Sequence, residues 1–280
     1  MNSAKAFAPG NISCVFVIRK TKNPNKSGSL GIGFTVDKGV TVTIKKLNNK
    51  SKKTKKNKIY FNNKKMELSF VDSVIKKLTK ERFIVKIKSQ LPLGSGFGIS
   101  GASALATAYA VDKLLKLKLP KKKLAFIAHI SEVENGTGLG DVVNQYFGGF
   151  LVKYESSYKF RVKKLPINNK PIYYKCFNKL DTKKIISNKK IKGRINKAGL
   201  KSLKEIKKSK KTLENMIRIS KRFALFSGLL KKKELIRQMI EIEVSYGSAS
   251  MIMLGNAIFS NKKFKGSKKL VIKDKCAYLI

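Results

Sequence analysis

Cysteine and arginine are scarce in this chain, and it has no long apolar run. Three cysteines stand far apart without a C-x-x-C pair: Cys14, Cys176 and Cys276. This spacing argues against a zinc site or a disulfide framework and predicts reduced, structural thiols. The central apolar run stops at Asp112, and Pro9-Gly10 interrupts the one near the start. We therefore expect no membrane span, no signal peptide and a cytoplasmic protein.

The scarcity of arginine bears on how the strong positive charge is interpreted. Lysine and arginine total 63 against 16 acidic residues, a net charge of +47, but only seven of the 63 are arginine. Cations release counterions when they bind phosphates, so nucleic acid is a candidate partner. Base-reading surfaces favour arginine, however. Lysine, asparagine and isoleucine are raised together here, as in proteins of AT-rich genomes, so we interpret the lysines as a solvated surface and expect no nucleic-acid partner.

The distribution of apolar residues predicts an α+β fold. The length of 280 residues suits two modest domains. Alternating or β-branched segments predict strands at 12–18, 40–45, 58–61, 83–87, 150–154, 159–162 and 172–177. Helical periodicity predicts helices at 68–78, 100–116, 121–132, 140–146, 197–208, 213–230 and 233–244. A strand-rich half followed by a helix-rich half indicates α+β architecture, which we divide into residues 1–160 and 161–280.

Two lysine-rich runs fall between or on these elements. Residues 45–58 are predicted to form a hairpin loop, and residues 201–211 are predicted to be an exposed helix face.

A cluster of glycines precedes the helix predicted at 100–116, in the stretch LPLGSGFGISGASAL. Such a loop can place unpaired backbone N–H groups and the positive end of a helix dipole beside a bound anion. The glycines alone therefore leave two interpretations, a phosphate-binding loop and a plain tight turn. The P-loop pattern is excluded because no Lys-Ser/Thr pair follows the glycines. A dinucleotide fingerprint matches at Gly96, Gly98 and Gly101, but Pro-Lys-Lys-Lys stands at 120–123, where the acidic residue is needed.

Four segments resemble the motifs of the GHMP kinases. Residues 92–102 resemble the pattern P-x-x-x-G-L-G-S-S-A, and GTGLGDVVNQYFGG (136–149) resembles the segment in which an aspartate precedes a Gly-Gly pair by seven positions. AHISE (128–132) resembles the helix that supplies a metal-binding glutamate in archaeal mevalonate kinases, and APGNIS (8–13) resembles the first motif. The match covers residues 6 to 155 well and the rest loosely.

Within that superfamily, the combination of GSGFG with GTGLGDVV resembles the archaeal pantoate kinases. The resemblance implies ATP-dependent phosphorylation of (R)-pantoate to 4-phosphopantoate on the archaeal route to coenzyme A. It also implies an N-terminal domain like ribosomal protein S5 domain 2, a ferredoxin-like C-terminal domain and a homodimer. Another GHMP kinase, for shikimate, mevalonate or homoserine, and a lysine-rich nucleic-acid-binding protein remain alternatives.

The resemblance also implies roles for individual residues. ATP would be held by Pro92, Gly94, Ser95, Gly96, Phe97, Gly98, Ile99, Ser100, Gly101 and Ala102. Ser100 and Glu132 would bind Mg²⁺, which accepts a few hard oxygen ligands and retains waters. Asp141 would face the acceptor hydroxyl and take or orient its proton. Without the resemblance, the position of Asp141 favours a helix N-terminal charge over a catalytic role.

On the substrate side, the resemblance implies contacts from Ser29, His129 and Lys153. His129 is the only histidine and lies one turn before Glu132 on the same predicted helix face. Lys153 stands where pantoate kinases tend to have arginine, and a lysine supplies a point charge rather than a bidentate fork. Asn11 replaces a cationic residue common in the first motif, and residues 246–250 keep one glycine where the third motif is glycine-rich.

Overall fold

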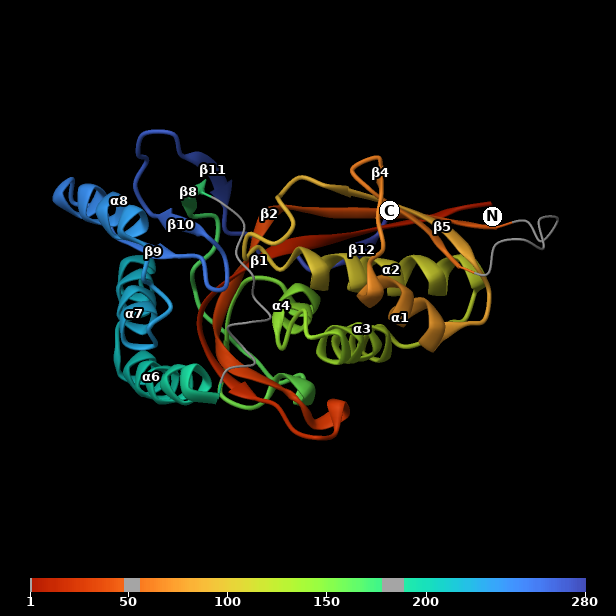
Figure 1. The fold of residues 1–280 in the computed structure, drawn as a ribbon, viewed down its shortest axis with the longest axis horizontal. Coiled ribbons are helices and arrows are strands. Elements are labelled where there is room, and N and C mark those ends of the chain that lie inside the picture. Colours follow the sequence, from red (N-terminus) through yellow and green to blue (C-terminus); the bar gives the residue numbers. More distant parts are fainter. Residues whose placement is uncertain (1, 48–55, 178–188) are drawn as a thin grey trace.

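The computed structural model describes residues 2–47, 56–177 and 189–280, which form two β-sheets with helices packed against them (Figure 1). Within these residues the larger sheet has eight strands in the order β12-β1-β2-β5-β3-β4, with β6 on β2 and β7 on β6. Its strands are β1 (Ala4–Arg19), β2 (Gly28–Lys46), β3 (Lys58–Phe61), β4 (Lys64–Lys65), β5 (Phe83–Ser89), β6 (Phe150–Lys153), β7 (Lys163–Lys164) and β12 (Tyr278–Leu279). This mixture of sheets and helices confirms the predicted α+β class.

β1 and β2 form a long antiparallel pair in the middle of the larger sheet. The first half of β2 pairs with β6 and its second half pairs with β5. The β1–β2 register shifts between Pro9 and Asn11 and again between Ser13 and Val15. Such bulges re-aim side chains and are common beside functional sites. Asn11 and Ser13, which lie between the two shifts, accordingly direct their side chains toward the helix that follows Gly140.

Four helices pack on and beside this sheet: α1 (Ser69–Leu78), α2 (Ile99–Leu115), α3 (Lys121–Asn135) and α4 (Asp141–Phe147). From Gly101 to Val111, α2 is wholly buried, because it is covered by β1 and β2 on one side and by α1 and α3 on the other. Its small residues, mostly alanine and glycine, suit such a crowded position. The N-terminus of α2 is thereby fixed with respect to the sheet.

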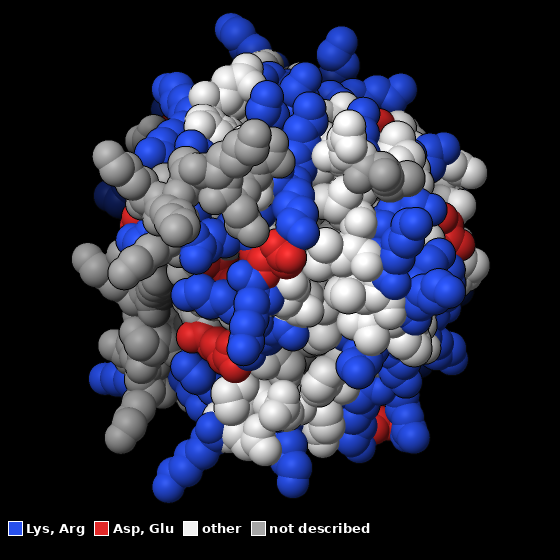
Figure 2. Space-filling view, turned by 90° about the vertical axis from the view of Figure 1, so that its right-hand side faces the viewer, with Lys and Arg blue, Asp and Glu red and all other residues white. Residues whose placement is uncertain are grey.

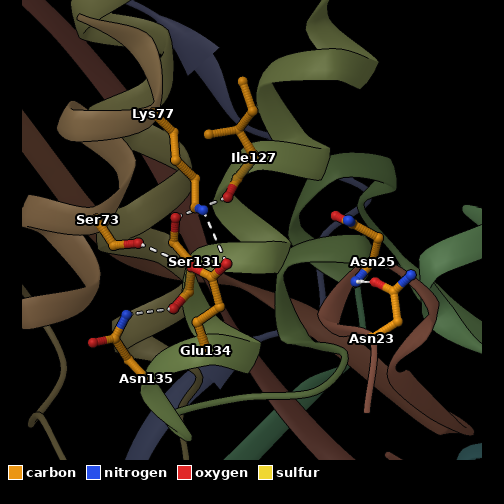
Figure 3. A network of polar contacts seen from close by, with 8 residues as sticks. All are labelled: Asn23, Asn25, Ser73, Lys77, Ile127, Ser131, Glu134 and Asn135. Atoms are coloured by element: carbon orange, nitrogen blue, oxygen red, sulfur yellow. Dashed lines mark hydrogen bonds and ion pairs between the residues drawn. The ribbon is translucent and has the colours of Figure 1, made fainter. Parts of the chain in front are cut away.

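Polar contacts tie α1 to α3 at the surface (Figure 3). Lys77 Nζ lies 2.9 Å from Glu134 Oε1, and Ser73 Oγ donates to Glu134 Oε2 at 3.4 Å. Asn135 donates to the carbonyl of Ser131 one turn earlier. An ion pair that remains one-third exposed stabilises a fold little. The contact between α1 and α3 is therefore stabilised mainly by buried packing.

The second sheet has four strands, in the order β11-β8-β10-β9, within the described residues. They are β8 (Pro171–Cys176), β9 (Ala249–Met251), β10 (Ala257–Ser260) and β11 (Lys268–Val271), at the left of Figure 1. Helices α7 (Leu213–Phe226) and α8 (Lys233–Val244) contact this sheet, and α6 (Lys189–Lys208) packs on α7 and β1. After β11 the chain returns to the first sheet, where β12 pairs with β1. The division at residues 160/161 stays a prediction.

Several predicted elements differ from the structure. The strand predicted at 159–162 is wrong: Ser157–Lys159 is a short 3-10 helix (η2), and Phe160 turns into the core with a left-handed φ of 51°. The helix predicted at 213–230 ends at Phe226, near Gly228 with φ 71°. Another 3-10 turn, η1, spans Pro24–Lys26. Most of the hairpin predicted at 45–58 lies outside the described residues.

Positive charge is spread over the face of the molecule that Figure 2 shows. Figure 2 shows the face at the right of Figure 1, with Lys and Arg side chains over much of it and few acidic ones. On α6, Lys201, Lys204 and Lys207 are exposed, as predicted for this helix face. In the described part of the chain, none of the helices combines the length and apolar character needed to cross a membrane.

Candidate active site

One cavity of about 350 Å³ lies where β1, β2, the glycine loop and the loop before α4 meet. This volume suits a small ligand. Its wall is polar at Ser13, Ser29, Ser100, Thr137, Asp141 and Lys153, and apolar at Val15, Phe16, Leu30, Ile32, Phe70, Leu93, Leu139, Met253 and Leu254. Residues from distant parts of the sequence therefore converge on one space.

The glycine loop delivers the N-terminus of α2 to this cavity. Gly98 is the N-cap, in the left-handed conformation with φ 61°, and the first helical hydrogen bond runs from Ala102 N to Gly98 O. The backbone N–H groups of residues 99–101 therefore precede the helical bonding pattern and are available to an anion. Gly94 and Gly96, with φ of 80° and 85°, adopt the same backbone region, which is strained for other residues.

The ten residues predicted to hold ATP divide into two groups. The cavity is lined by Gly94, Gly96, Phe97, Gly98, Ile99 and Ser100, and not by Pro92, Ser95, Gly101 or Ala102. Pro92 is exposed, whereas Ser95, Gly101 and Ala102 are buried behind the loop. The side chains of the second group therefore do not line the cavity, and among these four residues only Gly101 offers a backbone N–H from the unpaired first turn of α2.

A segment of the second sheet braces the glycine loop from behind. Met253 and Leu254 line the cavity, and the backbone of Gly255 packs directly on the carbonyl of Ser95. A Cβ on Gly255 would overlap that carbonyl and lie 2.9 Å from Gly96 N. The contribution of the C-terminal half thus comes from 252–256, between β9 and β10, rather than from the segment at 246–250 considered from the sequence.

Gly255→Ala should weaken nucleotide binding, because the new methyl group must push the glycine loop away from its bracing segment. Overpacking of this kind costs about 1–3 kcal/mol, and we expect the KM for ATP to rise roughly tenfold. Gly193→Ala on α6 is the matched control, since among the described residues nothing beyond the adjacent backbone of its own helix lies within 4 Å of its Cβ position. Equal KM values for ATP in both variants would remove the bracing role.

Glu132 is a buried carboxylate held between two hydroxyl groups. It accepts from Ser100 Oγ at 3.1 Å and from Thr137 Oγ1 at 2.5 Å. Burial raises the pKa of Glu132 to about 8, although Thr137 and Ser100 oppose the rise. A Cβ on Gly138 would overlap Glu132 Oε2, so only glycine fits beside this carboxylate, which is 1% exposed and lies behind the cavity wall rather than on it.

The hydroxyl and carboxylate of Ser100 and Glu132 fit the predicted magnesium ligands in chemistry and in proximity. Hard oxygen donors suit Mg²⁺, which also retains waters. Within the described ranges, no three His, Cys, Asp or Glu side chains gather as a metal centre. Any cation bound here would therefore rely on this pair together with waters and ligand oxygens.

Asp141 opens α4 at the cavity wall. Its Oδ1 accepts from Asn11 Nδ2 at 2.6 Å and from Ser13 Oγ at 3.1 Å. Burial raises the pKa of Asp141, while Lys153, Ser13 and Asn11 lower it. The structure thus places a carboxyl group whose pKa is raised by burial near the N-terminus of α2.

Lys153 ends β6 and reaches the same wall, with its side chain buried. Its Nζ donates to Gly140 O at 3.2 Å and to Asn144 Oδ1 at 2.6 Å. Burial lowers the pKa of Lys153 to about 8, and Asp141 opposes that shift. Ser29 lies beside it: its Oγ donates to Leu139 O at 3.3 Å, and a Cβ on Gly140 would overlap this hydroxyl. The two predicted substrate contacts are therefore brought together.

His129 does not join them. It is fully buried under Phe126 and Phe160, its Nε2 lies 3.0 Å from Ser27 O, and it is absent from the cavity wall. Burial lowers the pKa of His129 to about 4, Ser27 opposes the shift and Lys153 adds to it. The imidazole is thus neutral at pH 7, and the predicted contact with a substrate carboxylate has no support in this geometry.

His129 should make the protein sensitive to acid. The imidazole takes up a proton near pH 6.5 in the unfolded chain but only near pH 4 in the folded one. Its contribution to stability is therefore complete above pH 6.5 and is lost as pH falls toward 4, by up to about 3 kcal/mol. Urea unfolding of wild type and His129→Gln between pH 7 and 4 checks this: we expect the difference between the two free energies of unfolding to change with pH. Parallel curves would contradict it.

Sequence reasoning missed several residues of the site. Ser13, Thr137, Met253 and Leu254 line the cavity, and Asn144 contacts Lys153. Ser13 and Thr137 stand inside quoted motifs, so their position was available as a signal. Asn144 carries no pattern of its own, because its role depends on how α4 meets β1 and β6.

Comparisons with known proteins agree with this geometry. The family model of the GHMP kinases N terminal domain matches residues 68–149. The pantoate kinase of Methanocaldococcus jannaschii is 38% identical over 264 residues, covering 92% of each chain, and that of Methanospirillum hungatei is 28% identical over 91% of this chain and 86% of its own.

The fold has a counterpart among solved structures. One described as a phosphotransferase related to the CoA biosynthesis pathway superposes with a TM-score of 0.87 over 99% of this chain and 98% of that one, at 24% identity. The predicted GHMP kinase fold is confirmed. The long match at 38% identity settles the family: the chain belongs to the pantoate kinases, within the GHMP kinase superfamily.

Proposed function

We propose that the protein transfers the γ-phosphate of ATP to the 4-hydroxyl of (R)-pantoate, on the archaeal route to coenzyme A. The observation that carries the proposal is the convergence, in one cavity, of a helix N-terminus with free N–H groups, a carboxylate at Asp141 and an ammonium group at Lys153. These are the three features that a phosphate donor, an acceptor hydroxyl and a substrate carboxylate require.

Phosphoryl transfer depends mainly on positioning and on charge stabilisation. The acceptor oxygen forms a bond to the γ-phosphorus while the bond from that phosphorus to the β,γ-bridging oxygen breaks, and ADP leaves. Asp141 takes the proton of the acceptor hydroxyl. The N–H groups at the start of α2 hold the phosphates, and Ser100 and Glu132 would hold the Mg²⁺ that accompanies ATP and supplies positive charge to the phosphate oxygens.

Lys153 suits the carboxylate of pantoate. An ammonium group has three N–H donors, and within the described residues two of them serve Gly140 O and Asn144 Oδ1. The third is left for a ligand. Leu30 and Ile32, neighbours of Ser29 along β2, line the same cavity and offer apolar surface to the two methyl groups of pantoate.

Purified protein incubated with ATP, Mg²⁺ and a panel of acceptors tests the proposal through release of ADP. We expect pantoate to be turned over in preference to shikimate, mevalonate and homoserine. Turnover of one of these with none of pantoate would overturn the assignment of the acceptor. Loss of turnover with EDTA and its return with Mg²⁺ tests the cation.

Two further proposals concern the setting of the reaction. We place it in the cytoplasm, where ATP is held. We also propose a homodimer, as the family resemblance favours, which sedimentation at several protein concentrations would test.

A further inference from the structure

Two buried asparagines link Lys153 to Asp141. Lys153 Nζ donates to Asn144 Oδ1 at 2.6 Å, Asn144 Nδ2 donates to Asn11 Oδ1 at 2.8 Å, and Asn11 Nδ2 donates to Asp141 Oδ1 at 2.6 Å. Asn11 and Asn144 are 0% and 1% exposed. Solvent therefore does not reach the two amides in the middle of this chain of hydrogen bonds.

The chain runs in one direction only. An ammonium group can only donate, so Asn144 must turn its carbonyl toward Lys153 and its NH₂ toward Asn11. Asn11 must then turn its carbonyl toward Asn144 and its NH₂ toward Asp141, which accepts as a carboxylate. The cation at one end and the anion at the other thus fix the orientation of both amides.

The backbone is shaped to admit this chain. The bulge in β1 aims Asn11 at α4, as described above. Opposite Asn144, a Cβ on Gly33 would lie 2.8 Å from Asn144 Nδ2, and a Cβ on Gly98 would lie 3.2 Å from that of Asn11. Both glycines therefore leave room for the two amides.

We propose that Asn144 is a positioning residue for phosphoryl transfer, which through Asn11 holds Asp141 so that Oδ1 is occupied and Oδ2 faces the acceptor hydroxyl. Among the described residues, the side chains of Asn11 and Ser13 both donate to Oδ1 of Asp141. The other oxygen is left to accept the proton. This inference rests on the proposed function for its reaction, but its geometry can be tested without a substrate.

Three variants test the proposal: Asn144→Ala, Asn11→Ala and the double variant. Each single change breaks the chain, so we expect kcat to fall about 10- to 100-fold in either one, since misplacement of a catalytic group costs that much, with the KM for ATP within about twofold of wild type. The double variant should be no slower than the slower single variant. A double variant that loses the product of the two factors would overturn the proposal.

Asn144→Asp separates positioning from packing. It keeps the size of the side chain and the acceptor for Lys153, but it cannot donate to Asn11, so we expect kcat to fall about as far as in Asn144→Ala. Wild-type kcat in this variant would refute the proposal. Asn196→Ala is the matched control. Asn196, on α6, accepts from Ile18 N and donates to Ile18 O on β1 and does not line the cavity, so its replacement should leave kcat unchanged.

A readout that needs no acceptor distinguishes failure of this inference from failure of the proposed function. In urea unfolding, Asn11→Ala and Asn144→Ala should together destabilise the protein by less than the sum of the single effects, because each removes the same link. The pair Asn144→Ala and Asn196→Ala should be additive. If the effects of Asn11→Ala and Asn144→Ala are additive, the proposed hydrogen-bonded chain is overturned, even when the wild type turns over pantoate. If they are non-additive but the wild type is inactive on pantoate, only the assignment of pantoate as the acceptor is overturned.

Discussion

Asp141→Asn should abolish most phosphoryl transfer while ATP still binds. The amide is nearly isosteric and its oxygen can still accept from Asn11 and Ser13, but it cannot take a proton from the acceptor hydroxyl. General base catalysis contributes roughly 10²- to 10⁴-fold, so we expect kcat to fall by that range. ADP release with pantoate measures kcat, and calorimetric titration measures the Kd for ATP.

The Kd for ATP in this variant should stay within about threefold of wild type, because Asp141 lies at the acceptor end of the cavity. A near-normal kcat would show that the carboxylate is not the base. A large loss of ATP affinity would instead point to a role at the phosphates. Replacement of an exposed carboxylate, Glu67→Gln, is the control for the removal of a charge.

Lys153→Met should weaken the binding of pantoate far more than that of ATP. Loss of a hydrogen bond to a charged group costs about 1.5–3 kcal/mol, which predicts a KM for pantoate roughly 10- to 150-fold higher. Lys153 also lowers the pKa of Asp141, so its removal raises that pKa. The acid limb of the kcat profile should therefore move to higher pH.

Lys163→Met provides the matched control, because Lys163 is exposed on the neighbouring strand β7. It should leave both KM values and the acid limb unchanged. If Lys153→Met leaves the KM for pantoate unchanged, Lys153 does not contact the carboxylate of pantoate. If the acid limb does not move, Lys153 does not influence the pKa of Asp141.

Local sequence patterns predicted the helices well and the strands less well. α1, α3 and α8 begin within a residue of their predicted starts, because buried apolar positions recur at helical spacing. β2 was predicted only from Val40, because Gly28, Gly31 and Gly33 interrupt the alternating apolar pattern in its first half. There the backbone closely approaches β1. The short strands β10, β11 and β12 pair with strands far away in the sequence, which periodicity cannot show, and β9 has only three residues.

The sequence also predicted part of the candidate site correctly and part of it wrongly. Ser29, Ser100, Asp141 and Lys153 all reach the cavity, because motifs fix which residues follow the loop and helix ends. His129 has the spacing of a site residue, yet its helix turns it into the core beneath Phe160. Spacing determines the face of a helix, but packing decides whether that face meets a ligand or an aromatic ring.

The pairing of β12 with β1 has a consequence for the order of folding. Ala6 lies opposite Leu279, and Ala277 N donates to the carbonyl of Gln145 on the helix that Asp141 opens. Contacts between residues so distant in sequence form late, because the intervening chain must first be ordered. On refolding from denaturant, turnover should therefore recover with the slowest phase, after most helical signal has returned.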